Sequence, residues 1–251
     1  MNKPAIFLSP FLVLLLVGCS STATLVKLDS RPGVTQGFIH IMPKEPPVAS
    51  VILYAGGDGN LRLNSAYSMQ WGEANFLVRT RQKFANHGFQ VAVIDTPVNR
   101  QGHMTMSRRG QDHVTDSKAV ANFLRSQAAV PVWIVGTSRG TESVSNLAVN
   151  GNGAFDGAVF TSSVRAASYF NLEEVTIPVL VVHNKLDGCG VSGPSVAENI
   201  YNKLVNSKNR ELIWFSSTAK KSSDCQARSP HGYLGIESQV VDAIAVFIKS
   251  N

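Results

Sequence analysis

The chain is poor in the features that mark several classes of protein. It holds 3 cysteines in 251 residues, and their spacing does not match that of a zinc site. The net charge is +6, but lysine and arginine form no continuous run and no patch with interleaved aromatic residues. Internal repeats and low-complexity tracts are absent as well. These absences argue against a zinc module, a repeat protein and a nucleic-acid partner.

Long apolar runs are also few, and the most prominent one lies near the N-terminus. Residues 5–17 form an apolar run that follows Lys3 and is too short to span a bilayer comfortably. A short positive region followed by an apolar segment of this length is typical of a secretory signal. Residues 1–18 are therefore predicted to be a signal peptide that is removed from the mature protein.

The four residues at 16–19, Leu-Val-Gly-Cys, resemble the bacterial lipobox. The resemblance implies cleavage before Cys19 and acylation of Cys19 with chains such as palmitate, which anchor a domain stably when two or three are present. Ser20 and Ser21 are similar to the residues of lipoproteins sorted to the outer membrane of Gram-negative bacteria. The expected location is therefore the cell envelope, at the periplasmic face of the outer membrane. The alternative is an ordinary secretory signal, because the small residue before Cys19 also suits ordinary cleavage.

The rest of the chain is long enough for one domain with a full hydrophobic core. Residues 19–35, rich in Ser, Thr and Gly, are predicted to form a lipidated tether, and residues 36–251 to form the domain. The oligomeric state does not follow from the sequence.

Apolar β-branched runs alternate with amphipathic segments along this domain, which predicts a mostly parallel sheet of seven or eight strands covered on both faces. The expected strands are 36–42, 49–54, 89–94, 130–135, 157–161, 178–184 and 211–215, and the expected helices are 75–86, 112–127, 141–149, 194–205 and 238–249. Residues 102–111 are predicted to be a polar loop. The short connection at 162–177 predicts an open cleft without a large lid.

One motif in this pattern points to chemistry. Residues 136–140, Gly-Thr-Ser-Arg-Gly, follow an apolar strand and precede a helix. A G-x-S-x-G sequence in that setting is a nucleophile elbow, a sharp turn that exposes a serine hydroxyl at the edge of a sheet. The motif occurs by chance as a glycine-rich turn, so the interpretation needs partners for Ser138: an acid and then a histidine, later in the chain.

Both partners are present in the expected order. Asp187 comes just beyond the strand predicted at 178–184, where ligand-binding residues lie in open α/β sheets. His231 lies after the last predicted strand and before the C-terminal helix, whereas the other histidines fall within strands, at a helix end or before the elbow. An ordinary turn aspartate and a surface histidine remain the alternatives.

The elbow, Asp187 and His231 together resemble the triad of the α/β-hydrolase superfamily. The resemblance implies a three-layer sandwich without a large cap domain, a Ser138–His231–Asp187 triad, and an oxyanion hole made by the backbone N–H groups of Gly57 and Arg139. It implies no cofactor and no metal.

The oxyanion loop at residues 55–59 departs from the superfamily pattern. Ala55 stands where a histidine is usual, and Asp58 brings a carboxylate close to a site that must hold an anion. Asp58 either binds a cationic group of the substrate or points away. Arg108, Arg109, Arg139 and Arg165 are candidates for binding an anionic group, although solvated loop arginines are the commoner case.

Cys189 and Cys225 remain after acylation of the first cysteine, and an even pair in an oxidising compartment predicts a disulfide. The bridge would join the loop of Asp187 to the loop of His231. Two buried free thiols are the alternative.

The sequence thus predicts an exported, lipid-anchored serine hydrolase acting on a small ester or related acyl substrate. A peptidase, amidase or acyltransferase with the same residues is the alternative within enzymes. A binding lipoprotein that keeps the fold without turnover is the alternative outside them.

Overall fold

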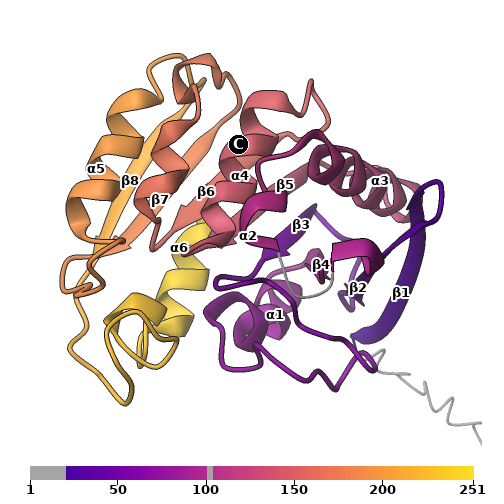
Figure 1. Cartoon of the computed structure of the whole chain (residues 1–251), viewed down its shortest axis with the longest axis horizontal. Coiled ribbons are helices and arrows are strands. Elements are labelled where there is room, and N and C mark those ends of the chain that lie inside the picture. The colour runs from indigo at the N-terminus through magenta and orange to yellow at the C-terminus, as the bar shows by residue number, and fades with distance from the viewer. Residues whose placement is uncertain (1–20, 101–103) are drawn as a thin grey trace, which may run out of the picture.

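The computed structural model describes residues 21–100 and 104–251 and builds them around one eight-stranded sheet, shown in Figure 1. The strand order is β1-β2-β4-β3-β5-β6-β7-β8. Strands β1 and β2 and strands β2 and β4 pair antiparallel, and every other neighbouring pair is parallel. The strands are β1 (Thr22–Arg31), β2 (Val34–Met42), β3 (Ala49–Tyr54), β4 (Phe89–Ile94), β5 (Val132–Thr137), β6 (Gly157–Thr161), β7 (Val179–Asn184) and β8 (Arg210–Phe215).

Helices cover both faces of this sheet. The α-helices are α1 (Phe76–Asn86), α2 (Met104–Ser107), α3 (Gln111–Gln127), α4 (Gly140–Asn150), α5 (Pro194–Lys203) and α6 (Glu237–Lys249). The apolar faces of α1 and α6 belong to one core cluster, and those of α3, α4 and α5 belong to the other. The molecule is therefore a three-layer α/β/α sandwich, as predicted.

The continuous apolar strands explain the two cores. Every residue of β3 is buried, and successive side chains point to opposite faces of the sheet. Val51 and Leu53 pack on the α1 and α6 side, whereas Ile52 and Tyr54 pack on the α3 and α4 side. Such strands have no solvent-facing side, and this is why their sequence shows no polar alternation.

The N-terminal edge of the sheet differs from the sequence prediction. Residues 22–31, expected to belong to a tether, form strand β1, which pairs with β2 along its length (indigo, Figure 1). Gly33, with φ +71°, follows Pro32 in the turn that joins the two strands. Arg31 fixes the hairpin to α3 through an ion pair of 2.8 Å with Asp116. The folded domain thus begins near Thr22, not at residue 36. The predicted signal peptide and Cys19 lie outside the described residues.

Two connections between strands can also be compared with the structure that the sequence predicts for them. Part of the loop expected at 102–111 forms the short helix α2, and residues 102 and 103 lie outside the described residues. Between β6 and β7 there are only two short 3-10 helices, η2 (Arg165–Tyr169) and η3 (Leu172–Glu174). Among the described residues, no helix is long and apolar enough to cross a membrane.

The topology also determines where chemistry can occur. Strands β3, β5, β6, β7 and β8 run parallel, so the loops that follow them lie at one edge of the sheet. The predicted oxyanion loop follows β3, the elbow follows β5, and the loops of the predicted acid and base follow β7 and β8.

Candidate active site

The elbow is a strained turn between β5 and α4. Ser138 has φ +53°, in the left-handed region that L-residues other than glycine rarely adopt. Its carbonyl oxygen accepts hydrogen bonds from the backbone N–H (2.9 Å) and the hydroxyl (2.6 Å) of Thr141, and its own N–H donates to Thr161 (3.1 Å). Such strain costs about 1–3 kcal/mol and persists only where the surroundings hold it.

Two glycines allow the elbow to form. A Cβ on Gly136 would lie 2.5 Å from the carbonyl oxygen of Gly140, and one on Gly140 would overlap the carbonyl oxygen of Tyr54 in β3. The glycines therefore let helix α4 start against the backbone of two strands. This is the physical reason for the spacing of the motif.

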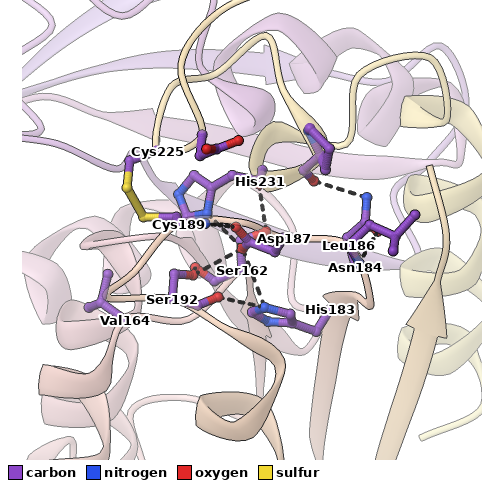
Figure 2. A network of polar contacts seen from close by, with 12 residues as sticks. Ser162, Val164, His183, Asn184, Leu186, Asp187, Cys189, Ser192, Cys225 and His231 are labelled. Atoms are coloured by element: carbon purple, nitrogen blue, oxygen red, sulfur yellow. Dashed lines mark hydrogen bonds and ion pairs between the residues drawn. A yellow bond between two sulfur atoms is a disulfide. The ribbon is translucent and has the colours of Figure 1, made fainter. Parts of the chain in front are cut away.

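The structure brings the predicted acid and base into direct contact. Nδ1 of His231 lies 2.8 Å from Oδ2 of Asp187 (Figure 2). Because an ionised carboxylate only accepts hydrogen bonds, Nδ1 carries the hydrogen and Nε2 presents its lone pair. His231 is 4% exposed, and its Nε2 has no hydrogen-bond partner among the described residues. The ring therefore has the tautomer and the unpaired nitrogen that a general base requires.

Three further groups hold the Asp187 carboxylate. Oδ1 accepts from the N–H of Cys189 (2.9 Å), and Oδ2 accepts from the hydroxyl of Ser192 (3.2 Å). Nε2 of His183 lies 2.8 Å from the carbonyl oxygen of Ser192 and 3.3 Å from Oδ2 (Figure 2). A carbonyl only accepts hydrogen bonds, so Nε2 of His183 carries a hydrogen and also points toward the carboxylate.

These donors decide the charge of Asp187. Burial by itself would raise the pKa of Asp187, but the hydrogen bonds from His183 and His231, the positive charge of His231 when that ring is protonated and the N–H of Cys189 together lower it to about 2. The carboxylate is therefore ionised at neutral pH, as it must be to stabilise an imidazolium.

Covalent and polar links join the acid loop to the base loop. Cys189 and Cys225 form a disulfide, as predicted, with a sequence separation of 36. Closing a loop of this length stabilises the fold by about 3–4 kcal/mol in the chain-entropy model. Nδ2 of Asn184 donates to the carbonyl oxygen of Pro230 (3.1 Å), and the hydroxyl of Ser162 donates to that of His231 (2.6 Å). These three links hold the loop that carries the imidazole of His231 in place.

The predicted oxyanion loop lies directly against the elbow. A Cβ on Gly56 would lie 2.9 Å from Cβ of Ser138, so only glycine permits this approach. Gly57, with φ +57°, is covered by the indole of Trp71. Within the described part of the chain, neither the N–H of Gly57 nor that of Arg139 donates to another group. Both N–H groups are available for a ligand oxygen.

Arg108 supports this loop from beneath, a role that the sequence did not indicate. Its guanidinium donates to the carbonyl oxygens of Ala55 (2.8 Å) and Gly57 (3.5 Å) and to the hydroxyl of Ser143 (2.8 Å). Burial lowers the pKa of Arg108 to about 10, and Glu142 partly offsets that effect, so the group stays charged at neutral pH. A buried cation therefore lies beside the region where negative charge would develop.

The remaining charged candidates are exposed or form ion pairs with other residues. Asp58 is exposed, accepts a hydrogen bond from the hydroxyl of Thr105 (3.3 Å) and does not line the cavity that contains Ser138. Arg109 pairs with Glu142 at 2.7 Å, and Arg139 and Arg165 are exposed.

One cavity, of about 260 Å³, is lined by residues of the elbow, the His231 loop and the predicted oxyanion loop. Its walls include Ser138, His231 and Gly57 together with the rings of Trp71 and Phe76. A larger cavity of about 320 Å³, lined in part by Met104 and His113, contains none of the predicted residues. We place the candidate active site in the smaller cavity because Ser138, His231 and Gly57 all line it; the hydroxyl of Ser138 and Nε2 of His231 are not hydrogen-bonded to each other.

Among the described residues, no group of three or more His, Cys, Asp or Glu side chains is placed to hold a metal ion. The groups that the described residues bring to this region are a hydroxyl, an imidazole, a carboxylate and backbone N–H groups.

Solved structures of hydrolases share this arrangement of strands and helices. An esterase of Pyrococcus furiosus matches with a TM-score of 0.66 at 11% identity, over 92% of this chain and 93% of that one. A dienelactone hydrolase of Anabaena variabilis matches with a TM-score of 0.65 at 14% identity, over 92% and 98%. Est1E of Butyrivibrio proteoclasticus matches with a TM-score of 0.61 at 14% identity, over 90% and 97%.

No protein-family model matches the sequence, and no curated protein is similar to it in sequence. Identities of 11–14% show the fold and leave the reaction to be argued from the site. The mostly parallel eight-stranded sheet, covered on both faces and with no cap domain among the described residues, has the α/β-hydrolase fold.

Proposed function

We propose that the protein is a serine hydrolase that cleaves small carboxylic esters through an acyl-enzyme. One observation carries the proposal: Nε2 of His231, oriented by Asp187, is unpaired among the described residues and lies in the wall of the cavity that also exposes Ser138. A structural histidine pair has no need of a strained serine beside it. The esterases and the dienelactone hydrolase with the same fold support the reaction class.

The proposed reaction has two half-reactions, and in each of them His231 first accepts a proton and then returns it. The hydroxyl oxygen of Ser138 attacks the ester carbonyl carbon while Nε2 of His231 takes the hydroxyl proton. The carbonyl oxygen becomes an oxyanion held by the N–H groups of Gly57 and Arg139. The intermediate then collapses, and the proton on His231 passes to the departing alcohol. Water repeats the sequence on the acyl-enzyme and releases the acid.

The cavity favours a small acyl group. At about 260 Å³ it is at or below the lower end of typical ligand pockets, and Trp71 and Phe76 supply apolar walls. Amide cleavage and acyl transfer use the same residues. We favour hydrolysis of esters because water has free access to a site without a cap domain.

The test is to locate a covalent adduct. A fluorophosphonate probe should label the protein, and peptide mapping should place the phosphonyl group on Ser138. Ser138→Ala should not label, whereas Ser163→Ala, which removes a buried serine beyond the next strand, should label normally. Parallel assays with p-nitrophenyl esters and peptide amides separate esterase from peptidase. A folded protein that neither labels nor hydrolyses any of these substrates would be a binding protein and would refute the proposal.

We further propose that the protein is exported and anchored in the outer membrane by acyl chains on Cys19. The lipobox-like sequence at residues 16–19 supports this, as does the disulfide, since disulfides persist in oxidising compartments. The expected result is a mature N-terminus at Cys19 with the mass of attached acyl chains, and loss of both the acyl mass and this N-terminus in Cys19→Ser. A mature protein of unmodified mass in membrane fractions would contradict the anchor.

A further inference from the structure

The side chain of Asn75 is held in one orientation at the start of helix α1. Its Oδ1 accepts a hydrogen bond from the N–H of Leu77 (3.2 Å), as in a helix N-cap. Its backbone N–H donates to Gly72 (2.8 Å), and its carbonyl oxygen accepts from the N–H of Arg79 (2.9 Å). With Oδ1 committed to the helix, the amide cannot flip without losing the cap. The NH2 group must therefore point away from the helix.

That NH2 group lies near the nucleophile. Nδ2 of Asn75 lies 3.4 Å from the position that a Cβ on Gly56 would occupy, and Cβ of Ser138 lies 2.9 Å from the same point. Asn75 also lines the cavity that contains Ser138, Gly57 and His231. The amide nitrogen and Cβ of Ser138 are thus both close to Gly56, beside the same cavity.

The amide has no acceptor in the part of the chain that the structure describes. Among the described residues, no oxygen accepts a hydrogen bond from Nδ2 of Asn75. Its acceptor must then be water or a bound ligand. A neutral donor of this kind, fixed before the substrate arrives, stabilises negative charge without reorganising.

We infer that Asn75 is a third donor of the oxyanion hole, whose amide NH2 binds the substrate oxygen that becomes negative. This inference rests on the proposed esterase function. It adds a side-chain donor, from the loop before α1, to the backbone donors of Gly57 and Arg139. The negatively charged oxygen would then be held from three elements: the loop after β3, the start of α4 and the start of α1.

Two substitutions separate this role from helix capping. Asn75→Ser keeps a good N-cap and loses the NH2 group, and Asn75→Asp keeps the cap while placing a carboxylate at the same point. If Asn75 only caps α1, Asn75→Ser should be as active and about as stable as the unsubstituted protein, because serine is as good an N-cap as asparagine and adds no charge beside Ser138. If Asn75 is an oxyanion donor, kcat should fall by about 10²-fold in Asn75→Ser and further in Asn75→Asp.

The experiment measures kcat, KM and thermal stability on p-nitrophenyl acetate. Asn86→Asp is the matched control, because it adds the same charge to the exposed far end of α1. We expect losses in kcat with KM and melting temperature nearly unchanged, and a control that behaves as the unsubstituted protein. Full kcat in Asn75→Ser beside an active unsubstituted protein overturns this inference alone. An unsubstituted protein no more active than Ser138→Ala overturns the esterase proposal, and the inference with it.

Discussion

Replacing His231 with alanine is expected to lower kcat for ester hydrolysis by about 10⁶-fold. The ring is the group that accepts the proton of Ser138, and Asp187 holds its other nitrogen at 2.8 Å. Among the described residues no other imidazole is placed to substitute, since His183, the other histidine on Asp187, uses its Nε2 on Ser192 and Asp187. Steady-state kinetics on the purified variant would measure the loss.

The fold should survive this change because the His231 loop is held largely by its backbone. The carbonyl oxygen of His231 accepts from Ser162, and its N–H donates to the hydroxyl of Ser229 (3.2 Å); both contacts remain in alanine. His87→Ala is the control, a half-buried histidine that pairs with Asp242 in α6. Retention of more than a tenth of the activity by a folded His231→Ala protein would remove His231 from the mechanism.

Replacing Gly140 with alanine is expected to cost at least about 3 kcal/mol of folding free energy and to abolish the elbow. The new methyl group would overlap the carbonyl oxygen of Tyr54 and lie 2.9 Å from its carbonyl carbon and 3.0 Å from the carbonyl oxygen of Ala55. Both partners are backbone atoms of a central strand and its loop, so neither can rotate away. Helix α4 must then move off the sheet and take Ser138 with it.

Urea unfolding monitored by circular dichroism would measure this cost. Gly37→Ala is the control: a Cβ there has no heavy atom within 4 Å, so its free energy of unfolding should stay within about 1 kcal/mol. Equal stabilities of the Gly140→Ala and Gly37→Ala proteins would show that α4 does not need this close approach.

The parts of the fold that could be predicted are those in which sequence and local structure agree. Apolar β-branched runs at β3, β5 and β7 are buried on both faces, and their pattern indicates a parallel sheet directly. The order of Ser138, Asp187 and His231 could be used because a parallel sheet carries the loops after its strands to one edge. Strand β1 was missed because its residues are mostly half-exposed and polar, although Pro32 and Gly33 signal its turn.

The supporting residues could not be predicted because their roles depend on contacts between distant segments. Arg108 lies in a polar stretch typical of a loop, yet it is buried beneath residues more than forty positions away. His183 has the sequence environment of a core histidine, and only the turn after β7 brings Asp187 to its ring. Asn75 carries a signal for a helix start, but nothing in the sequence indicates that its amide lies beside Ser138.

The early start of β1 limits how far the domain can stand from a membrane. Three residue steps separate Cys19 from Thr22, where the strand begins, and a fully extended chain covers about 11 Å in that number of steps. An acylated Cys19 would therefore leave no stalk, and the β1 side of the sheet would sit almost on the lipid headgroups.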